Sequence, residues 1–182
     1  MIMNNQSASF VTDSTLGRLT KWLRVMGCDA YYQSEYKKTE IERLLEKGRI
    51  LLTKNRTLKS SFTPSILILS DKIQDQLIEI NKHGLLPATN QNWFKRCIKC
   101  NTPLKSLQIK DAQGRIPEYI ISQKIEVIHH CSSCNRYFWP GSHRENMLKQ
   151  INEWGLLRGE NTSPPTQPNE INSFDTERVT CD

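Results

Sequence analysis

The stretch ILLTKNR, residues 50–56, decides how the first half of this chain folds. Its apolar half is too short and too continuously apolar for an amphipathic helix, so we predict a buried strand over residues 49–53. The polar half, Lys54, Asn55 and Arg56, is either an ordinary strand end or part of a functional site. The choice depends on which other residues the fold brings to the same place.

Strands and helices alternate on both sides of this stretch. Short apolar runs predict further strands at residues 10–12, 28–32 and 65–69. Periodic apolar residues predict three helices, which begin at Ser14 or Thr15, at a capping box formed by Thr39 and Glu42, and after Asp71. Such alternation is typical of an α/β fold in which helices cover both faces of a parallel sheet.

Polar residues follow several of the predicted strands. The carboxyl ends of parallel strands meet at one edge of the sheet, where α/β proteins form their sites, and here those ends carry Asp13, Asn55 and Asp71. Converging carboxylates hold Mg²⁺ or Mn²⁺ for phosphodiester cleavage, and Glu40 and Glu42 are further candidates. Each acid also has a plainer explanation, as a favourable charge at a helix N-terminus or as a capping-box partner.

Composition and charge narrow the class of protein. The chain has 182 residues, 37% of them apolar and 24% charged, which fits one ordinary domain or two small ones. The formal net charge is +6, but residues 159–182 hold five acidic residues against one arginine, so residues 1–158 carry +10. This basic body is either a nucleic-acid surface or a solubilising one. Without a signal-peptide pattern or a long apolar run, we expect a cytoplasmic protein with no membrane partner.

Four of the six cysteines form two Cys-x-x-Cys pairs. Two such turns supply the four thiolates that structural zinc prefers, and a filled tetrahedron leaves no open position for catalysis. We therefore predict a zinc ribbon, with His129 and His130 as bystanders; a redox dithiol and inert buried thiols are the alternatives. The predicted zinc ligands are Cys97, Cys100, Cys131 and Cys134.

Four segments of the chain resemble one known family. They are Asp13 with LGRLTKWLRVMGCDAYY from residue 16, then GRILLTKNRTL, RCIKCNTPL and CSSCNRYFWPGSHRENM, in this order between residues 10 and 147. Together they resemble the Mut-seven C-terminal RNase domain family. The resemblance implies a PIN-like α/β domain with a parallel sheet flanked by helices, followed by a zinc ribbon. We expect these at residues 8–90 and 95–158, the latter with a terminal helix, and a disordered acidic tail at 159–182.

The resemblance also implies a catalytic site. Members are regarded as RNases or RNA-processing factors whose strand-end acids bind divalent metal. By position, Asp13 matches the first-strand aspartate of the family and is a metal ligand or its organiser. We expect Asp71 or a glutamate of the second predicted helix, Glu40 or Glu42, to assist it. The family usually has an aspartate where this chain has Asn55, and an amide cannot act as a base. The candidate catalytic residues are Asp13, Asn55, Asp71 and Glu42, with Mg²⁺ or Mn²⁺ as the ion.

Basic residues would bind RNA even if the metal site were lost. Contacts with RNA phosphates need only cations near the carboxyl edge of the sheet. For the cations of the first predicted helix, a solvated helix face is the plainer explanation. The candidates are Arg18, Lys21, Arg24, Lys54 and Arg56.

Aromatic residues follow the second cysteine pair. Tyr137, Phe138 and Trp139 either stack on bases or close the small core of the ribbon. The leading hypothesis is a metal-dependent ribonuclease acting on single-stranded RNA and weakened by Asn55. The alternatives are a catalytically degenerate RNA-binding module and a zinc-ribbon adaptor that contacts protein.

Overall fold

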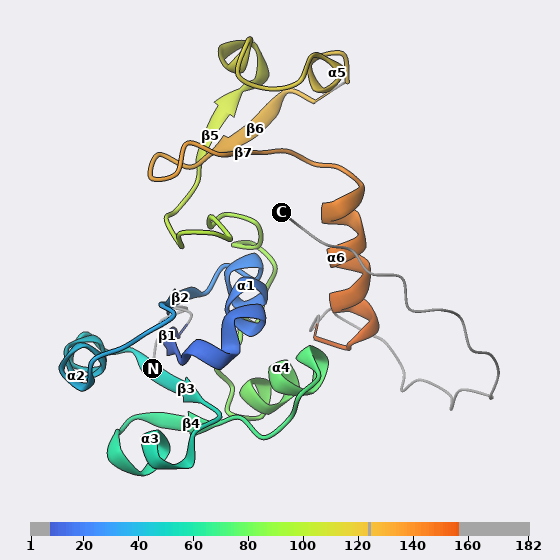
Figure 1. Ribbon diagram of the computed structural model, residues 1–182. Coiled ribbons are helices and arrows are strands. Elements are labelled where there is room, and N and C mark those ends of the chain that lie inside the picture. Colours follow the sequence, from blue (N-terminus) through green and yellow to red (C-terminus); the bar gives the residue numbers. More distant parts are fainter. Residues whose placement is uncertain (1–7, 124, 157–182) are drawn as a thin grey trace, which may run out of the picture.

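The computed structural model describes residues 8–123 and 125–156, and its first half is a parallel four-stranded sheet. The strands are β1 (Ser9–Thr12), β2 (Asp29–Tyr32), β3 (Ile50–Thr53) and β4 (Ser65–Leu67), in the order β2-β1-β3-β4 (Figure 1). Val11 lies opposite both Tyr31 and Leu51 in the register. The chain crosses from one side of β1 to the other, so the crevice between the ends of β1 and β3 is the switch point of the sheet.

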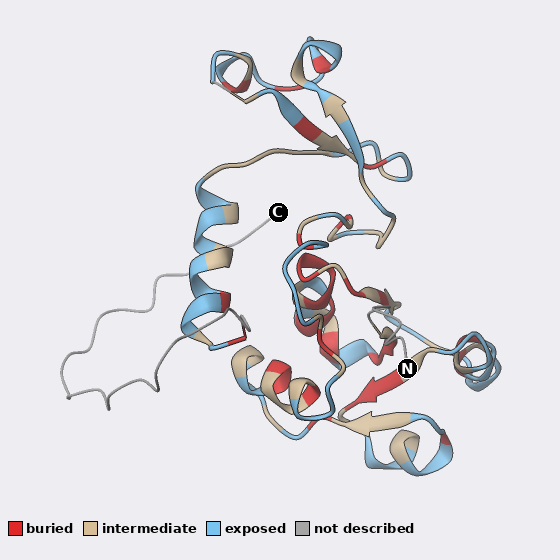
Figure 2. Cartoon of the chain, turned by 180° about the vertical axis from the view of Figure 1, so that it is seen from behind, coloured by how far each residue is buried: buried red, intermediate tan, exposed pale blue. Residues whose placement is uncertain are grey.

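Helices cover both faces of this sheet. Successive strand residues point to opposite faces, so Phe10 packs with α1 (Gly17–Val25) and α4 (Ile73–Lys82), whereas Val11 packs with α2 (Lys38–Glu46) and α3 (Arg56–Ser61). Both side chains are fully buried. Figure 2 shows that buried positions gather in the sheet and in α1. Each of these helices follows a strand, so all four begin at the carboxyl edge of the sheet.

Several local predictions were wrong in detail. Asp13 is the N-cap of the short 3-10 helix Ser14–Leu16, in place of Ser14 or Thr15. Helix α2 has Lys37 as its N-cap and no side-chain cap bond, so the Thr39 capping box does not form. Strand β4 stops at Leu67, and Leu69 is exposed. Helix α3 was not predicted, because six residues with one large apolar side chain carry no helical period.

The second half contains a small antiparallel sheet in the order β5-β6-β7. Its strands are β5 (Lys105–Gln108), β6 (Val127–His130) and β7 (Tyr137–Phe138), and the short helices Ile109–Ala112 and α5 (Glu118–Ile121) lie between β5 and β6. Its core is small and consists of Ala112, Ile116, Ile120 and Ile128. The predicted fold class, a parallel α/β sheet followed by a small ribbon, is confirmed. The predicted acidic tail lies outside the described residues.

Helix α6 (Ser142–Glu153) runs from the ribbon back to the first half of the chain (Figure 1). Ile151 is fully buried in the core around α1, and Trp154 meets Trp22 edge-on with ring centroids 4.8 Å apart. The helix predicted to close the ribbon therefore packs on the parallel domain. Within the described part of the chain, none of the helices is long and apolar enough to cross a membrane.

Candidate functional site

Asp13 lies at the switch point of the sheet and joins the ends of β1 and β3. Its Oδ1 accepts hydrogen bonds from the backbone N–H and the hydroxyl of Thr15, at 2.9 and 2.6 Å. Its Oδ2 accepts bonds from the Thr53 hydroxyl at 2.6 Å and from the Lys54 backbone N–H at 2.7 Å. The residue is only 6% exposed, so these four donors replace its water shell.

The four bonds determine what Asp13 can do. A carboxylate has about four lone-pair directions, and each of those on Asp13 already faces a donor. A metal ion would have to displace one of the two hydroxyls. As found, the Asp13 carboxylate therefore joins the ends of β1 and β3, and its part in binding a metal ion stays a prediction.

Asn55 and Asp71 occupy the same edge with different surroundings. The Asn55 side-chain oxygen accepts from the N–H groups of Thr57 and Leu58, at 2.8 and 3.3 Å, and caps α3. The Asp71 side chain is 93% exposed and forms an ion pair with Lys54. The hydrogen bond and charge of Lys54 lower the pKa of Asp71, so this carboxylate is ionised at neutral pH. Lys54 thus connects Asp13, through its backbone, to Asp71, through its side chain.

Glu40, in the first turn of α2, has other hydrogen-bond partners than Asp13, Asn55 and Asp71. It accepts hydrogen bonds from Gln33, which follows β2, and from Tyr31 of β2, at 3.1 and 3.3 Å. Glu42 is exposed, and its part in a catalytic site stays a prediction. Among the described residues, the four paired cysteines are the only group of three or more His, Cys, Asp or Glu close enough to hold a metal ion.

Cations surround the carboxyl edge. Arg18 and Lys21 of α1 and Arg56 of α3 are all exposed. The sequence prediction missed Lys37, Lys38 and Lys72, which are exposed and stand at the starts of α2 and α4. The signal was present, because strand-helix alternation puts every strand-to-helix turn at this edge. Cations near helix N-termini oppose the helix dipole, so their presence there favours an anionic ligand.

Arg24 differs from the other predicted cations. It is 5% exposed, and its guanidinium donates to the carbonyl oxygens of Ala30, Ile98 and Lys99 at 2.8–2.9 Å. Burial lowers its pKa, and the nearby cysteines oppose this shift. Arg24 therefore joins α1 and β2 to the first cysteine turn and does not lie on the surface that RNA would meet.

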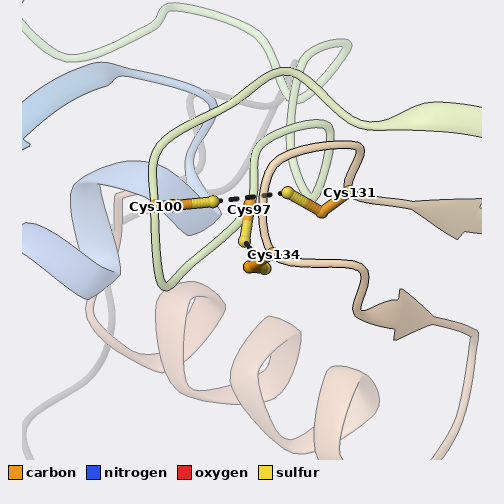
Figure 3. A group of neighbouring side chains, drawn as sticks. All are labelled: Cys97, Cys100, Cys131 and Cys134. Carbon is orange, nitrogen blue, oxygen red and sulfur yellow. Dashed lines mark hydrogen bonds between the residues drawn. The ribbon is translucent and has the colours of Figure 1, made fainter.

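The four paired cysteines converge between the two halves of the chain (Figure 3). Their sulfur atoms all lie within 4.8 Å of one another, with Cys97 to Cys134 at 3.6 Å and Cys100 to Cys131 at 3.3 Å. Zinc–sulfur bonds of about 2.3 Å in a tetrahedron put sulfurs about 3.8 Å apart, so the group is suited to zinc. Burial raises the pKa of Cys97 to about 12, and a bound metal would release this proton.

The two cysteine turns have the same backbone structure. In each, an asparagine follows the second cysteine with a positive φ, 69° at Asn101 and 58° at Asn135. Each asparagine N–H donates to the first cysteine's carbonyl oxygen, at 2.9 Å in both turns. Asparagine tolerates this left-handed conformation better than most residues, which explains the repeated Cys-x-x-Cys-Asn pattern.

The first cysteine turn is bonded to the parallel sheet. The Asn101 side chain donates to Asp29 at 2.6 Å and accepts from the Ala30 N–H at 3.1 Å. Arg49 forms two further bonds to the Asp29 carboxylate, at 2.7 and 3.0 Å. Burial would raise the pKa of Asp29, but the bonds from Arg49 and Asn101 outweigh it and the pKa is lowered. The two halves of the chain therefore share polar as well as apolar contacts.

The fold and these two groups of residues define an α/β domain with a charged carboxyl edge, coupled to a four-cysteine ribbon. Residues 8–151 match the family model described as the Mut7-C RNAse domain, so the chain belongs to this family. This confirms the resemblance seen in the sequence. A comparison with curated proteins and with solved structures found no match.

Proposed function

We propose that this protein is a metal-dependent ribonuclease of reduced activity that acts on single-stranded RNA at the carboxyl edge of its parallel sheet. The family match supports RNA as the substrate. The observation that supports this location is the pair of hydrogen bonds that Asp13 accepts from Thr53 and Lys54, because they join the ends of β1 and β3 next to Asn55.

The chain's own residues would bind and orient the substrate. Arg18, Lys21 and Arg56 are exposed near the starts of α1 and α3, where their charges can contact phosphate oxygens. Lys54 is held by its backbone bond to Asp13 and by its ion pair with Asp71. Its ammonium therefore has a defined position, and a phosphate could replace Asp71 as its partner.

The residues that would bind a catalytic metal ion offer ligand atoms of the right chemical type, but they are few. Asp13, Asn55 and Asp71 offer oxygen atoms, which Mg²⁺ and Mn²⁺ prefer. Only two of them are anionic, and the Asp13 oxygens already accept four hydrogen bonds. When bound, such an ion would lower the pKa of a water nucleophile and stabilise charge on the phosphate. These residues fit a weak site, and hence slow cleavage.

A second candidate function is RNA binding without cleavage. The filled acceptor positions of Asp13 favour it, because the network needs no metal ion to satisfy the carboxylate. The cations of the edge would then bind RNA while Asp13 and Asn55 only shape the turn.

Cleavage of a labelled single-stranded RNA separates the two functions. The full chain would be incubated with RNA in Mn²⁺, in Mg²⁺ and in chelator, beside variants Asp13→Ala and Asn55→Asp. The ribonuclease proposal predicts metal-dependent cleavage that Asp13→Ala abolishes and Asn55→Asp increases, while Glu46→Gln, an exposed acid at the other end of α2, has no effect. If the wild-type protein, Asp13→Ala and Asn55→Asp all bind this RNA but leave it intact, RNA binding without cleavage replaces the ribonuclease proposal.

A further inference from the structure

A groove of about 670 Å³ lies away from the carboxyl edge, between the ribbon, the connector at residues 90–98 and the start of α6. Figure 1 shows these three segments around the upper end of α1. The described residues that line the groove include no aspartate or glutamate, but they include three cations and two histidines. A groove of this composition favours an anionic ligand. The cations are Lys95, Arg96 and Arg144.

Aromatic side chains form much of the remaining lining. Phe94 comes from the connector and Trp139 from the segment after β7. Tyr119 of α5 is 61% exposed, although most large apolar side chains of the described residues are covered. Exposed aromatic rings beside cations are the groups on which single-stranded nucleic acids stack their bases.

Arg144 connects the charged and aromatic parts of the groove. Its guanidinium lies 4.8 Å from the centre of the Phe94 ring, which fixes the position of the positive charge. Its Nε–H is buried and has no hydrogen-bond partner in the described part of the chain. A phosphate in the groove would therefore contact the terminal amino groups of Arg144 through charge-assisted hydrogen bonds, since the buried Nε–H is out of its reach.

We infer that this groove binds a base and an adjacent phosphate of single-stranded RNA, with Tyr119 stacking on the base and Arg144 contacting the phosphate. The inference rests on the proposed function, because it names a second contact for the same substrate. Val25, the last residue of α1, lines the groove, whereas Arg18 lies near the first. Nine residues of α-helix span about 13 Å, so one RNA strand contacting both places must run along α1. The ribbon thus selects substrates by length and single-strandedness.

An acidic peptide is the competing type of ligand for a cationic groove. Carboxylates would pair with Arg144 and Lys95, but an acidic peptide has no flat rings for Tyr119 and Trp139 to stack on. The combination of the exposed Tyr119 ring with the cations therefore favours RNA.

Fluorescence anisotropy with a labelled single-stranded RNA of about twelve nucleotides tests the inference on the full, zinc-loaded chain. Tyr119→Ala and Arg144→Gln are each expected to weaken binding at least about fivefold, as loss of one stacked base or one phosphate contact would. Tyr119→Phe keeps the ring and is expected to bind within about twofold of wild type. Arg136→Gln is the matched control, because Arg136 is an exposed ribbon arginine that does not line the groove.

The outcomes distinguish this inference from the proposed function. If Arg56→Gln weakens binding while Tyr119→Ala and Arg144→Gln do not, RNA binds at the carboxyl edge and the groove is not part of the site. If wild-type protein binds no RNA, the proposed function fails and the inference with it. Displacement of RNA from the wild type by polyglutamate, at equal charge concentration, would identify the groove as a site for acidic peptide and overturn the inference.

Discussion

Replacement of Asp13 by asparagine tests whether this carboxylate organises the strand ends or serves mainly as a metal ligand. The first role predicts a loss of stability in the metal-free protein, and the second predicts none. Asparagine keeps one acceptor oxygen and turns the other into an amide donor. The new amide nitrogen would face one Thr hydroxyl, which can turn and accept from it, and one backbone N–H, that of Thr15 or Lys54, which cannot. Hydrogen bonds to charged groups contribute about 1.5–3 kcal/mol each, so the loss of both charged bonds at that oxygen predicts a destabilisation of about 3–6 kcal/mol.

Urea unfolding of the zinc-loaded protein, without added Mg²⁺ or Mn²⁺, measures this change. A loss of 3 kcal/mol lowers the midpoint by about 1.5 M urea if the slope is about 2 kcal/mol/M. In a thermal melt the same loss lowers Tm by about 6–12 °C. Asp71→Asn is the matched control: its side chain is 93% exposed, and no measurable change in stability is expected.

A carboxylate held mainly for metal binding would behave in the opposite way. Its replacement would leave the metal-free protein as stable as wild type, or more stable, because strained functional groups cost stability. That result for Asp13→Asn would refute the organising role. A double-mutant cycle with Thr53→Val gives a second check, since directly bonded partners should show a coupling energy of about 1 kcal/mol or more.

Three further changes test how the halves of the chain are held together. Cys100→Ser is expected to reduce zinc content from one ion per chain to almost none and to melt the ribbon, as measured by metal analysis and circular dichroism. Asp29→Asn removes charge from the bonds to Arg49 and is expected to cost about 2 kcal/mol at pH 7. The pKa of Asp29 is lowered in the folded state, so the difference in unfolding free energy between wild type and variant should be constant above pH 5 and shrink as pH falls below about 4. Urea titrations measure it, and an unchanged difference at pH 3 would contradict the prediction. Trp154→Ala removes the edge-on contact with Trp22 and is expected to lower stability by about 3 kcal/mol in the same assay, whereas no loss would show that α6 is not docked.

Local sequence patterns predicted much of the fold. Residues 50–53 form the buried parallel strand that their apolar run predicts. Strand-helix alternation predicted the parallel sheet, and the two Cys-x-x-Cys pairs predicted the cysteine cluster. These features depend on periodicity or on ligand chemistry, which are visible along the chain.

Local sequence patterns did not predict the contacts between segments that are distant in the chain. Asn55 caps α3, a contact that the sequence did not predict because α3 itself shows no helical period. Arg24 has the same helical spacing as exposed cations, yet it is buried because the first cysteine turn packs over it. Its role depends on residues more than seventy positions away.

The sequence by itself determined the class of fold, the cysteine cluster and the family to which the chain belongs. Only the tertiary structure decided that Asp13 is saturated by donors near the ends of β1 and β3, that α6 packs on α1, and that aromatic rings and cations line one groove. The reason is physical. Strand and helix formation follow from neighbouring residues, whereas the hydrogen-bond partners of a buried carboxylate follow from which strand ends the topology places side by side.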